Sequence, residues 1–292
     1  MTAQNAITTA GKKPLSTNIP FTLALGGGAA RGIGHIPVLE ALDELGVKPD
    51  LIVGTSMGSI YGASYAAGMS AKEIREYSIE TFESRVGLVK RILNNWSGSI
   101  TDLWNPLTSS LFDPVNMFEI LLPDPIRTRI EDLNIPFEAV TTDFYTHNQK
   151  VVKRGPVIPA IAASSSLPGL FKPVEIEGAL LIDGGFVNPT PFDVAKRPGA
   201  ISIAVDVTGD TGVRIGDERP TPTEAWIGAA QIMLHSITRE KLKSEQPDIL
   251  IRPNVGLFGA MEFHKVEEIL KSSEPAKDEL KRELDHKIQL SI

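Results

Sequence analysis

The sequence predicts an α/β protein of three layers (α/β/α), in which helices cover both faces of a mostly parallel central sheet. Short apolar runs typical of buried strands alternate with longer segments of helical periodicity, and this alternation is characteristic of parallel sheets. The first apolar run ends in three glycines, where a strand can turn into a helix. The 292 residues are 42% hydrophobic and 22% charged, which can fill the core of one large domain or two small ones.

The first four elements are expected in the order strand, helix, strand, helix. Phe21–Leu25 is a buried strand, and Ile36–Gly46 carries its apolar residues on one helical face. Asp50–Gly54 is a second apolar strand, followed by an alanine-rich helix at Met57–Ala67 that stops at Gly68. Further strands are expected at Phe137–Phe144, Lys150–Gly155, Gly178–Asp183, Ile201–Val207 and Asp248–Pro253, and further helices at Ala225–Leu242 and beyond Met261.

Composition excludes several classes of protein. Acidic residues outnumber basic ones by 36 to 29, for a net charge of −7, so we expect no nucleic-acid partner. The absence of cysteine excludes disulfides, thiolate nucleophiles and cysteine-ligated metals. Residues 1–20 are polar and are expected to form a flexible tail rather than a signal peptide. No run approaches the roughly 18 apolar residues of a membrane span, so we expect a soluble, cytoplasmic protein.

The stretch "GTSMGS" (Gly54–Ser59) lies between a predicted strand and a predicted helix. A Gly-x-Ser-x-Gly sequence in this setting makes a sharp turn that exposes Ser56 at the helix N-terminus, where free N–H groups favour developing negative charge. Small residues here can also serve close helix packing or phosphate binding. The strand-turn-helix setting favours a nucleophilic serine.

The stretch "GGGAARG" (Gly26–Gly32) provides successive backbone N–H groups, which can stabilise an oxyanion, and Arg31 adds a positive charge. The alternative is a dinucleotide loop in a Rossmann-like NAD(P)-dependent oxidoreductase. Asp50 argues against it, because this residue precedes the second strand instead of ending it, where a ribose would be held. In addition, none of the four tyrosines has a lysine four residues later, as a short-chain dehydrogenase would require.

The stretch "LLIDGGFVNPTP" (Leu180–Pro191) places Asp183 at the end of an apolar strand, before two glycines. Sites of α/β proteins gather at strand ends, although Asp-Gly-Gly alone also fits a hairpin turn. A Ser-His-Asp α/β-hydrolase carries its three residues in the chain order Ser, Asp, His, and His264 and His286 both follow Asp183. Their charged amphipathic segment favours a solvated helix instead. We assign His35 to a helix start near the site. No histidine spacing suggests zinc.

Three segments in the same order, "GGGAARGIGHIPVLEAL", "GTSMGS" and "DGGFVNPTP", resemble the glycine-rich loop, nucleophile elbow and Asp-Gly-Gly motif of the patatin-like phospholipase family. The resemblance extends from Phe21 nearly to the C-terminus, and "PDILIRPNVGLFGAMEFHKVEEIL" is similar to the bacterial branch. One departure is Ala162, where the family often has arginine. The resemblance implies a single patatin-like catalytic domain at 21–292, with a motif-bearing core at 21–208 and a C-terminal helical extension at 223–292.

The resemblance also implies a Ser-Asp dyad without histidine. Ser56 would attack a lipid ester carbonyl and Asp183 would accept its proton, which requires burial to raise the pKa of that carboxyl. The implied substrates are phospholipids or lysophospholipids, with peripheral membrane or micelle contact and neither metal nor organic cofactor. A catalytically idle lipid-binding module remains an alternative. The expected oxyanion site comprises Gly26, Gly27, Gly28, Arg31 and Met57.

Two stretches are candidates for contact with lipid. Glu83–Phe118 contains two of the three tryptophans and a basic patch, which fits either a lipid-facing segment or an ordinary packed helix. Ala163–Phe171 reads as a small-residue wall of an acyl pocket or as a plain loop. The family resemblance favours an acyl-binding role for both. Gly216–Glu224 is expected to be a long surface loop.

Overall fold

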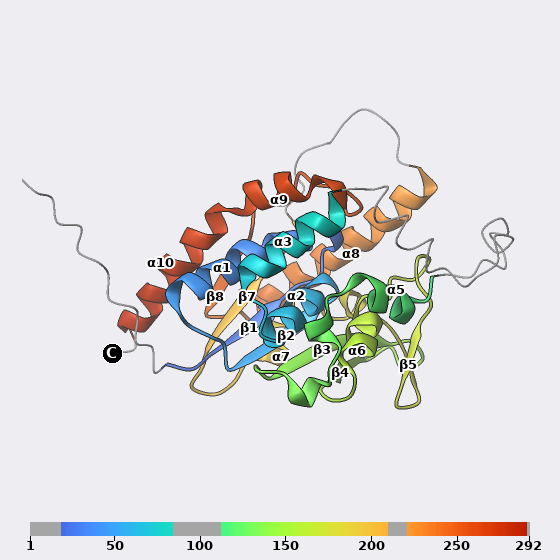
Figure 1. Ribbon diagram of the computed structural model, residues 1–292, viewed down its shortest axis with the longest axis horizontal. Helices are drawn as coiled ribbons and strands as arrows, with labels where there is room; N and C mark the ends of the chain where they lie inside the picture. Colours follow the sequence, from blue (N-terminus) through green and yellow to red (C-terminus); the bar gives the residue numbers. More distant parts are fainter. Residues whose placement is uncertain (1–18, 84–111, 210–220, 291–292) are drawn as a thin grey trace, which may run out of the picture.

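The computed structural model describes residues 19–83, 112–209 and 221–290 (Figure 1). These residues form an α/β fold with a mixed, mostly parallel sheet between helices, which confirms the predicted fold class. Residues 1–18 of the expected tail, 84–111 of the tryptophan-containing segment and 216–220 of the expected surface loop lie outside the described residues. No helix in the described ranges is long and apolar enough to cross a bilayer.

The sheet runs in the order β5-β6-β3-β2-β1-β7-β8, with β4 paired to β3. Every strand predicted from the apolar runs is present, to within three residues at either end, whereas the short β5 was not predicted. The parallel strands are β1 (Phe21–Leu25), β2 (Leu51–Thr55), β3 (Phe137–Asp143), β7 (Ile201–Val205) and β8 (Ile249–Ile251). The antiparallel ones are β4 (Gln149–Val152), β5 (Val174–Ile176) and β6 (Ala179–Asp183).

Strand register brings two distant chain segments to one point of β3. The strand β2 runs parallel to β3, and its last residue, Thr55, lies opposite Val140. The strand β6 runs antiparallel to β3, and its last residue, Asp183, lies opposite Thr141. Because Val140 and Thr141 are adjacent, β2 and β6 both end at the same place along the sheet.

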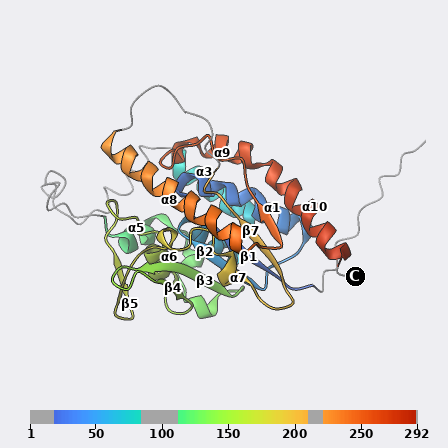
Figure 2. The same cartoon turned by 180° about the vertical axis from the view of Figure 1, so that it is seen from behind.

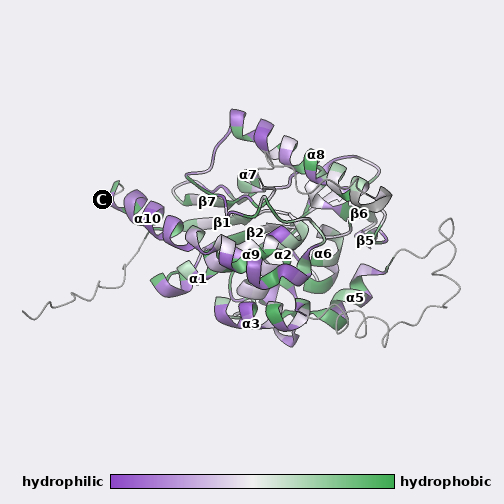
Figure 3. Ribbon diagram, turned by 90° about the horizontal axis from the view of Figure 1, so that it is seen from above, coloured by the Kyte–Doolittle hydropathy of each residue, from purple (hydrophilic) through white to green (hydrophobic). Residues whose placement is uncertain are grey.

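Two helical layers enclose the sheet, as Figure 3 shows. One face of the sheet carries the larger hydrophobic core, to which side chains of α1, α2, α3, α9 and α10 contribute. The other face of the sheet is covered by α7 and by α8, and Figure 2 shows α8 crossing this face. The strand β1 contributes to both cores, because Leu23 and Leu25 face one helical layer while Ala24 faces the other. The helices are α1 (His35–Leu45), α2 (Met57–Ala66), α3 (Ala71–Phe82), α5 (Pro114–Leu121), α6 (Val157–Ser164), α7 (Phe192–Ala195), α8 (Pro222–Ser244), α9 (Val266–Ser273) and α10 (Pro275–Leu290).

Local signals set the ends of several helices. The helix α1 ends at Gly46, whose φ of 69° is favourable only for glycine. The helix α3 begins with a capping box, in which Ser70 and Glu73 satisfy each other's backbone N–H groups. The helix α5 begins after Asp113, whose side chain caps the first turn. The prediction missed α3, α5, α6 and α7, although the capping box of α3 is readable in the sequence.

Candidate active site

The turn from β2 to α2 holds Ser56 in a strained backbone conformation. Its φ of 52° and ψ of −124° are unusual for a residue with a side chain, and such strain is typical of functional turns. The flanking glycines permit the turn, because a Cβ at Gly54 would lie 2.4 Å from the Cα of Ser59. A Cβ at Gly58 would lie 2.1 Å from the carbonyl oxygen of Leu25. These contacts explain the Gly-x-Ser-x-Gly spacing.

Ser164, at the end of α6, supports this turn. Its Oγ accepts a hydrogen bond of 2.9 Å from the Ser56 N–H and donates one of 2.6 Å to the Val140 carbonyl in β3. Sequence reasoning missed this contact, since nothing in the string of serines that contains Ser164 shows which hydroxyl meets the elbow. Ala162, at the departure from the family pattern, is buried, and its carbonyl accepts a hydrogen bond from the Ser166 hydroxyl.

The structure brings Ser56 and Asp183 together across 127 positions of sequence. The Ser56 hydroxyl donates to Asp183 Oδ2 at 2.8 Å, while Asp183 Oδ1 accepts the Gly185 N–H at 2.7 Å. Asp183 is only 6% exposed. Burial raises the pKa of Asp183 to about 6, although the hydrogen bonds from Gly185 and Ser56 oppose this shift. The carboxylate is therefore more basic than an exposed aspartate and touches the hydroxyl directly.

The glycine loop lies against Ser56, but two of its predicted N–H donors are already used. The Gly26 N–H donates to the Val205 carbonyl at 3.0 Å, and the Gly27 N–H donates to the Pro189 carbonyl at 2.8 Å. The prediction that Gly26 and Gly27 line the oxyanion site therefore needs correction, because these bonds fix the loop to neighbouring segments.

Two other predicted amides remain available. Among the described residues the Gly28 N–H has no hydrogen-bond partner. Met57 is the first residue of α2, where helix geometry leaves the N–H unpaired. A Cβ added at Gly27, the neighbour of Gly28, would lie 3.1 Å from the Cβ of Ser56, so the loop approaches the serine closely.

Arg31 also departs from its predicted role. Its Nε donates to the Phe258 carbonyl at 2.7 Å, and its Nη1 donates to the Thr208 carbonyl at 2.6 Å. The side chain lines a second cavity beside Glu262 and not the one that contains Ser56. The guanidinium therefore joins two loops instead of supplying charge to the oxyanion.

The histidines are not placed to serve as a base. His35 starts α1, is fully buried and donates from Nε2 to the Gly26 carbonyl at 2.7 Å; burial lowers its pKa to about 4. His264 is partly exposed on a 3₁₀ turn and His286 is exposed on α10; neither lines the cavity of Ser56. In the part of the chain that the structure describes, no histidine hydrogen-bonds to Ser56 or Asp183. The geometry thus argues against the Ser-His-Asp alternative.

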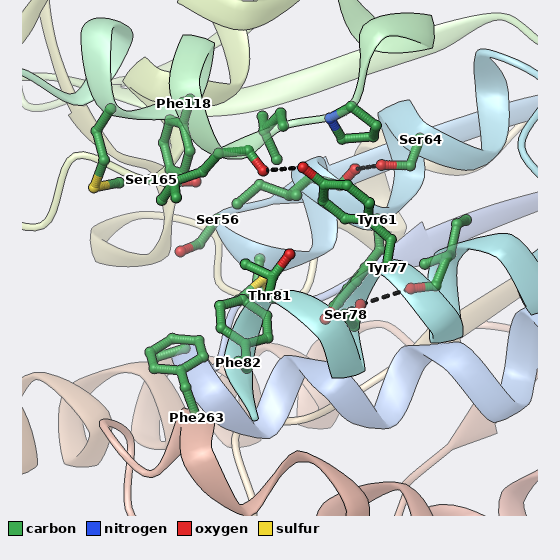
Figure 4. A pocket seen from close by; sticks show the side chains of 18 of the residues that line it. Ser56, Tyr61, Ser64, Tyr77, Ser78, Thr81, Phe82, Phe118, Ser165 and Phe263 are labelled. Carbon is green, nitrogen blue, oxygen red and sulfur yellow. Dashed lines mark hydrogen bonds between the residues drawn. The ribbon is translucent and has the colours of Figure 1, made fainter. Parts of the chain in front are cut away.

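An apolar cavity of about 300 Å³ contains both Ser56 and Asp183 in its wall (Figure 4). Most of its lining comes from α2, α3, α5 and the loop after α6, and includes Ile74 and Phe82. Phe263, on the 3₁₀ turn before α9, also contributes. Four residues of Ala163–Phe171 contribute, which favours the pocket wall over the plain loop for this stretch. The described end of Glu83–Phe118 also contributes, through Met117 and Phe118.

The described residues show no features of a metal or dinucleotide site. Within these ranges no cluster of three or more histidines, aspartates or glutamates could hold a metal ion. The glycine loop is poorly suited to a pyrophosphate, because Gly26 and Gly27 have no free N–H. Neither observation favours the oxidoreductase alternative.

The family follows from comparison with known proteins. A model of the patatin-like phospholipase family matches residues 23–196, the segment that contains the glycine loop, the elbow and Asp183. The chain belongs to the patatin-like phospholipase family. This match confirms the resemblance seen in the three motifs.

Relatives span mammals and bacteria. The chain is 31% identical over 278 residues to patatin-like phospholipase domain-containing protein 6 of mouse and human, a match that covers 87% of this chain and 20% of those proteins. It is 34% identical over 213 residues to an uncharacterized NTE family protein of Mycobacterium tuberculosis, covering 73% of this chain and 56% of that protein. The chain therefore spans about a fifth of the length of the two mammalian relatives.

A solved structure supports the fold. The structure of VipD from Legionella pneumophila superposes with a TM-score of 0.52 at 15% sequence identity, and the match covers 91% of this chain and 67% of that chain. At this identity the likeness concerns the arrangement of strands and helices.

Proposed function

We propose that the chain is a serine acyl hydrolase that cleaves carboxylic ester bonds of lipids, as a phospholipase A, lysophospholipase or esterase. The proposal rests on one observation, the 2.8 Å hydrogen bond between Ser56 Oγ and Asp183 Oδ2 in the wall of an apolar cavity. An apolar wall accommodates an acyl chain, and the serine-carboxylate pair supplies the nucleophile and its base. Family membership supports a lipid ester as the substrate.

In the first half-reaction the Ser56 hydroxyl transfers its proton to Asp183 Oδ2 while Oγ bonds to the ester carbonyl carbon. The carbonyl oxygen becomes an oxyanion, which the N–H groups of Gly28 and Met57 stabilise at the positive end of α2. The bond from carbon to the alcohol oxygen then breaks. Asp183 returns the proton to that oxygen, so the alcohol leaves and an acyl-Ser56 ester remains.

Water completes the cycle. Asp183 takes a proton from a water molecule as the water oxygen bonds to the acyl carbon, and the same N–H groups stabilise the second oxyanion. The bond to Ser56 Oγ breaks, the proton returns from Asp183 to Oγ, and the fatty acid is released. The pKa of about 6 suits this exchange, because the carboxylate is ionised at neutral pH and more basic than an exposed aspartate.

We also propose that residues 21–292 form one catalytic domain, with the core at 21–208 and the helical extension at 223–292. Support comes from packing: Leu280 and Leu284 of α10 belong to the same hydrophobic core as Leu39 of α1. Substrate would arrive by peripheral contact with a membrane or micelle.

Covalent labelling tests the function. A fluorophosphonate should label the wild-type protein at Ser56, Ser56→Ala should abolish labelling and hydrolysis of a nitrophenyl acyl ester, and Asp183→Asn should slow both at least a hundredfold. The control is Ser244→Ala, which alters an exposed serine at the end of α8 and should leave both unchanged. Full esterase activity in Ser56→Ala would refute the proposal. A wild-type protein that binds lipid but accepts no label would be a lipid-binding module.

A further inference from the structure

The cavity of Ser56 contains further serine and threonine hydroxyls that fall into two groups. Ser64, Ser78, Thr81 and Ser165 all line it. The Ser64 and Ser78 hydroxyls donate to backbone carbonyls of their own helices, at 2.8 and 2.7 Å. The hydroxyls of Thr81 and Ser165 make no such bond.

Thr81 and Ser165 are buried without satisfying their hydroxyls. Their exposed fractions are 6% and 8%, and neither Thr81 Oγ1 nor Ser165 Oγ has a hydrogen-bond partner among the described residues. A buried hydroxyl without a partner destabilises a fold, and such groups are uncommon in native proteins. Two of them in one otherwise apolar cavity suggest that a ligand supplies the missing partners.

The position of Ser165 relates it to the alcohol part of an ester. Ser165 lies next to the base, because the carbonyl of the following residue, Ser166, accepts the Asp183 N–H at 3.0 Å. In the proposed mechanism Asp183 returns a proton to the leaving alcohol, so that alcohol lies beside Ser165. Thr81 projects from the last turn of α3 and, like Ser165, lines the cavity that contains Ser56 (Figure 4).

The oxygens of the substrate narrow the choice of ligand. The scissile carbonyl oxygen is assigned to the N–H groups of Gly28 and Met57, the ester oxygen receives its proton from Asp183, and a saturated acyl chain offers no hydrogen-bonding group. Further oxygens must therefore belong to the alcohol, and glycerol carries an oxygen on every carbon. We propose that Thr81 and Ser165 determine specificity by hydrogen-bonding to glyceryl oxygens of the leaving alcohol, so that these two hydroxyls favour glyceryl esters over simple alkyl esters of the same fatty acid. This inference rests on the proposed function.

The test compares two neutral esters of one fatty acid, 1-decanoylglycerol and methyl decanoate, each below the concentration at which it aggregates. The measured quantity is the ratio of kcat/KM for the glyceryl ester to kcat/KM for the methyl ester. Thr81→Val and Ser165→Ala should each lower this ratio about tenfold, because the methyl ester has no oxygen for the lost hydroxyl to bind. Thr81→Ser keeps a hydroxyl and should retain most of the ratio.

Ser64→Ala and Ser78→Ala are matched controls in the same cavity. Their hydroxyls are already bonded, so each should change the rates on both esters by a common factor and leave the ratio unaltered. The urea unfolding midpoints of Thr81→Val and Ser165→Ala should be no lower than that of wild type, since neither hydroxyl has a partner to lose. Wild-type midpoints combined with a lowered ratio support the inference.

Two outcomes overturn it. In the first, the wild type is labelled at Ser56 and hydrolyses both esters, but the ratio stays constant in Thr81→Val and Ser165→Ala. This result overturns the inference and leaves the proposed function standing. A wild-type protein that hydrolyses neither ester and accepts no fluorophosphonate refutes the proposed function and this inference with it.

Discussion

The ionised carboxylate of Asp183 should destabilise the folded protein. Burial raises its pKa from 3.8 to about 6, and each pKa unit corresponds to about 1.4 kcal/mol. The folded state therefore favours the protonated acid, and its stability falls as the pH rises from about 4 through 6. Above pH 6 the cost approaches about 3 kcal/mol, a substantial part of the stability of an ordinary domain.

Replacing Asp183 by asparagine removes the charge and keeps the shape. The amide oxygen can still accept the Gly185 N–H that now bonds to Oδ1. We expect Asp183→Asn to be inactive yet more stable than wild type by up to about 3 kcal/mol at pH 8. The difference should shrink below pH 6 and vanish near pH 4, where the wild-type carboxyl is protonated.

The assay is urea unfolding of both proteins at pH 5 and pH 8. The control is Asp143→Asn. Asp143 accepts hydrogen bonds from the Thr146 and Tyr145 N–H groups, which lower the pKa of its carboxyl. This variant should therefore gain no stability at pH 8. Independently, kcat/KM of the wild type should fall below about pH 6 as Asp183 takes up a proton. A stability difference between Asp183→Asn and wild type that is equal at both pH values would refute the reasoning.

Three further predictions concern the elbow and the histidines. Ser164→Ala removes the acceptor of the Ser56 N–H and should lower kcat on a nitrophenyl ester about tenfold with little change in KM, and an unaltered kcat would contradict its supporting role. Gly58→Ala drives a Cβ to within 2.1 Å of the Leu25 carbonyl oxygen, so urea unfolding should show a loss of about 3 kcal/mol or more, and wild-type stability would show that the turn can relax. His286→Ala should leave kcat/KM unchanged, whereas a complete loss of activity would favour the Ser-His-Asp triad over the Ser-Asp dyad.

The fold was predictable where local pattern decides the structure. The apolar strands β1 and β2 and the helices that follow them are each encoded in a short stretch, so their bounds were found to within about one residue. The helices α6 and α7 are short, and tertiary packing determines them more than periodicity does. The strand β5 has three residues and exists through its pairing with β6.

The catalytic pair could be predicted from the sequence, whereas the hydrogen bonds of the glycine loop could not. The motifs identified Ser56 and Asp183, because a strand end followed by glycine is a local feature. The N–H partners of Gly26 and Gly27 are carbonyls of Val205 and Pro189, more than 150 positions away in the chain. Nothing in a short sequence window reveals such long-range bonds, so the sequence could not show that the N–H groups of Gly26 and Gly27 are occupied while that of Gly28 is free.

The shared end point of β2 and β6 on β3 has a consequence for how this architecture can vary. The distance between the reacting oxygens is set by adjacent rungs of one sheet, although 127 positions of chain separate the residues that carry them. Loops between those rungs can therefore lengthen, shorten or acquire whole insertions without disturbing the chemistry, since loop length changes closure entropy only slowly. Substrate preference can diverge in the connections while the reaction stays anchored to the strands.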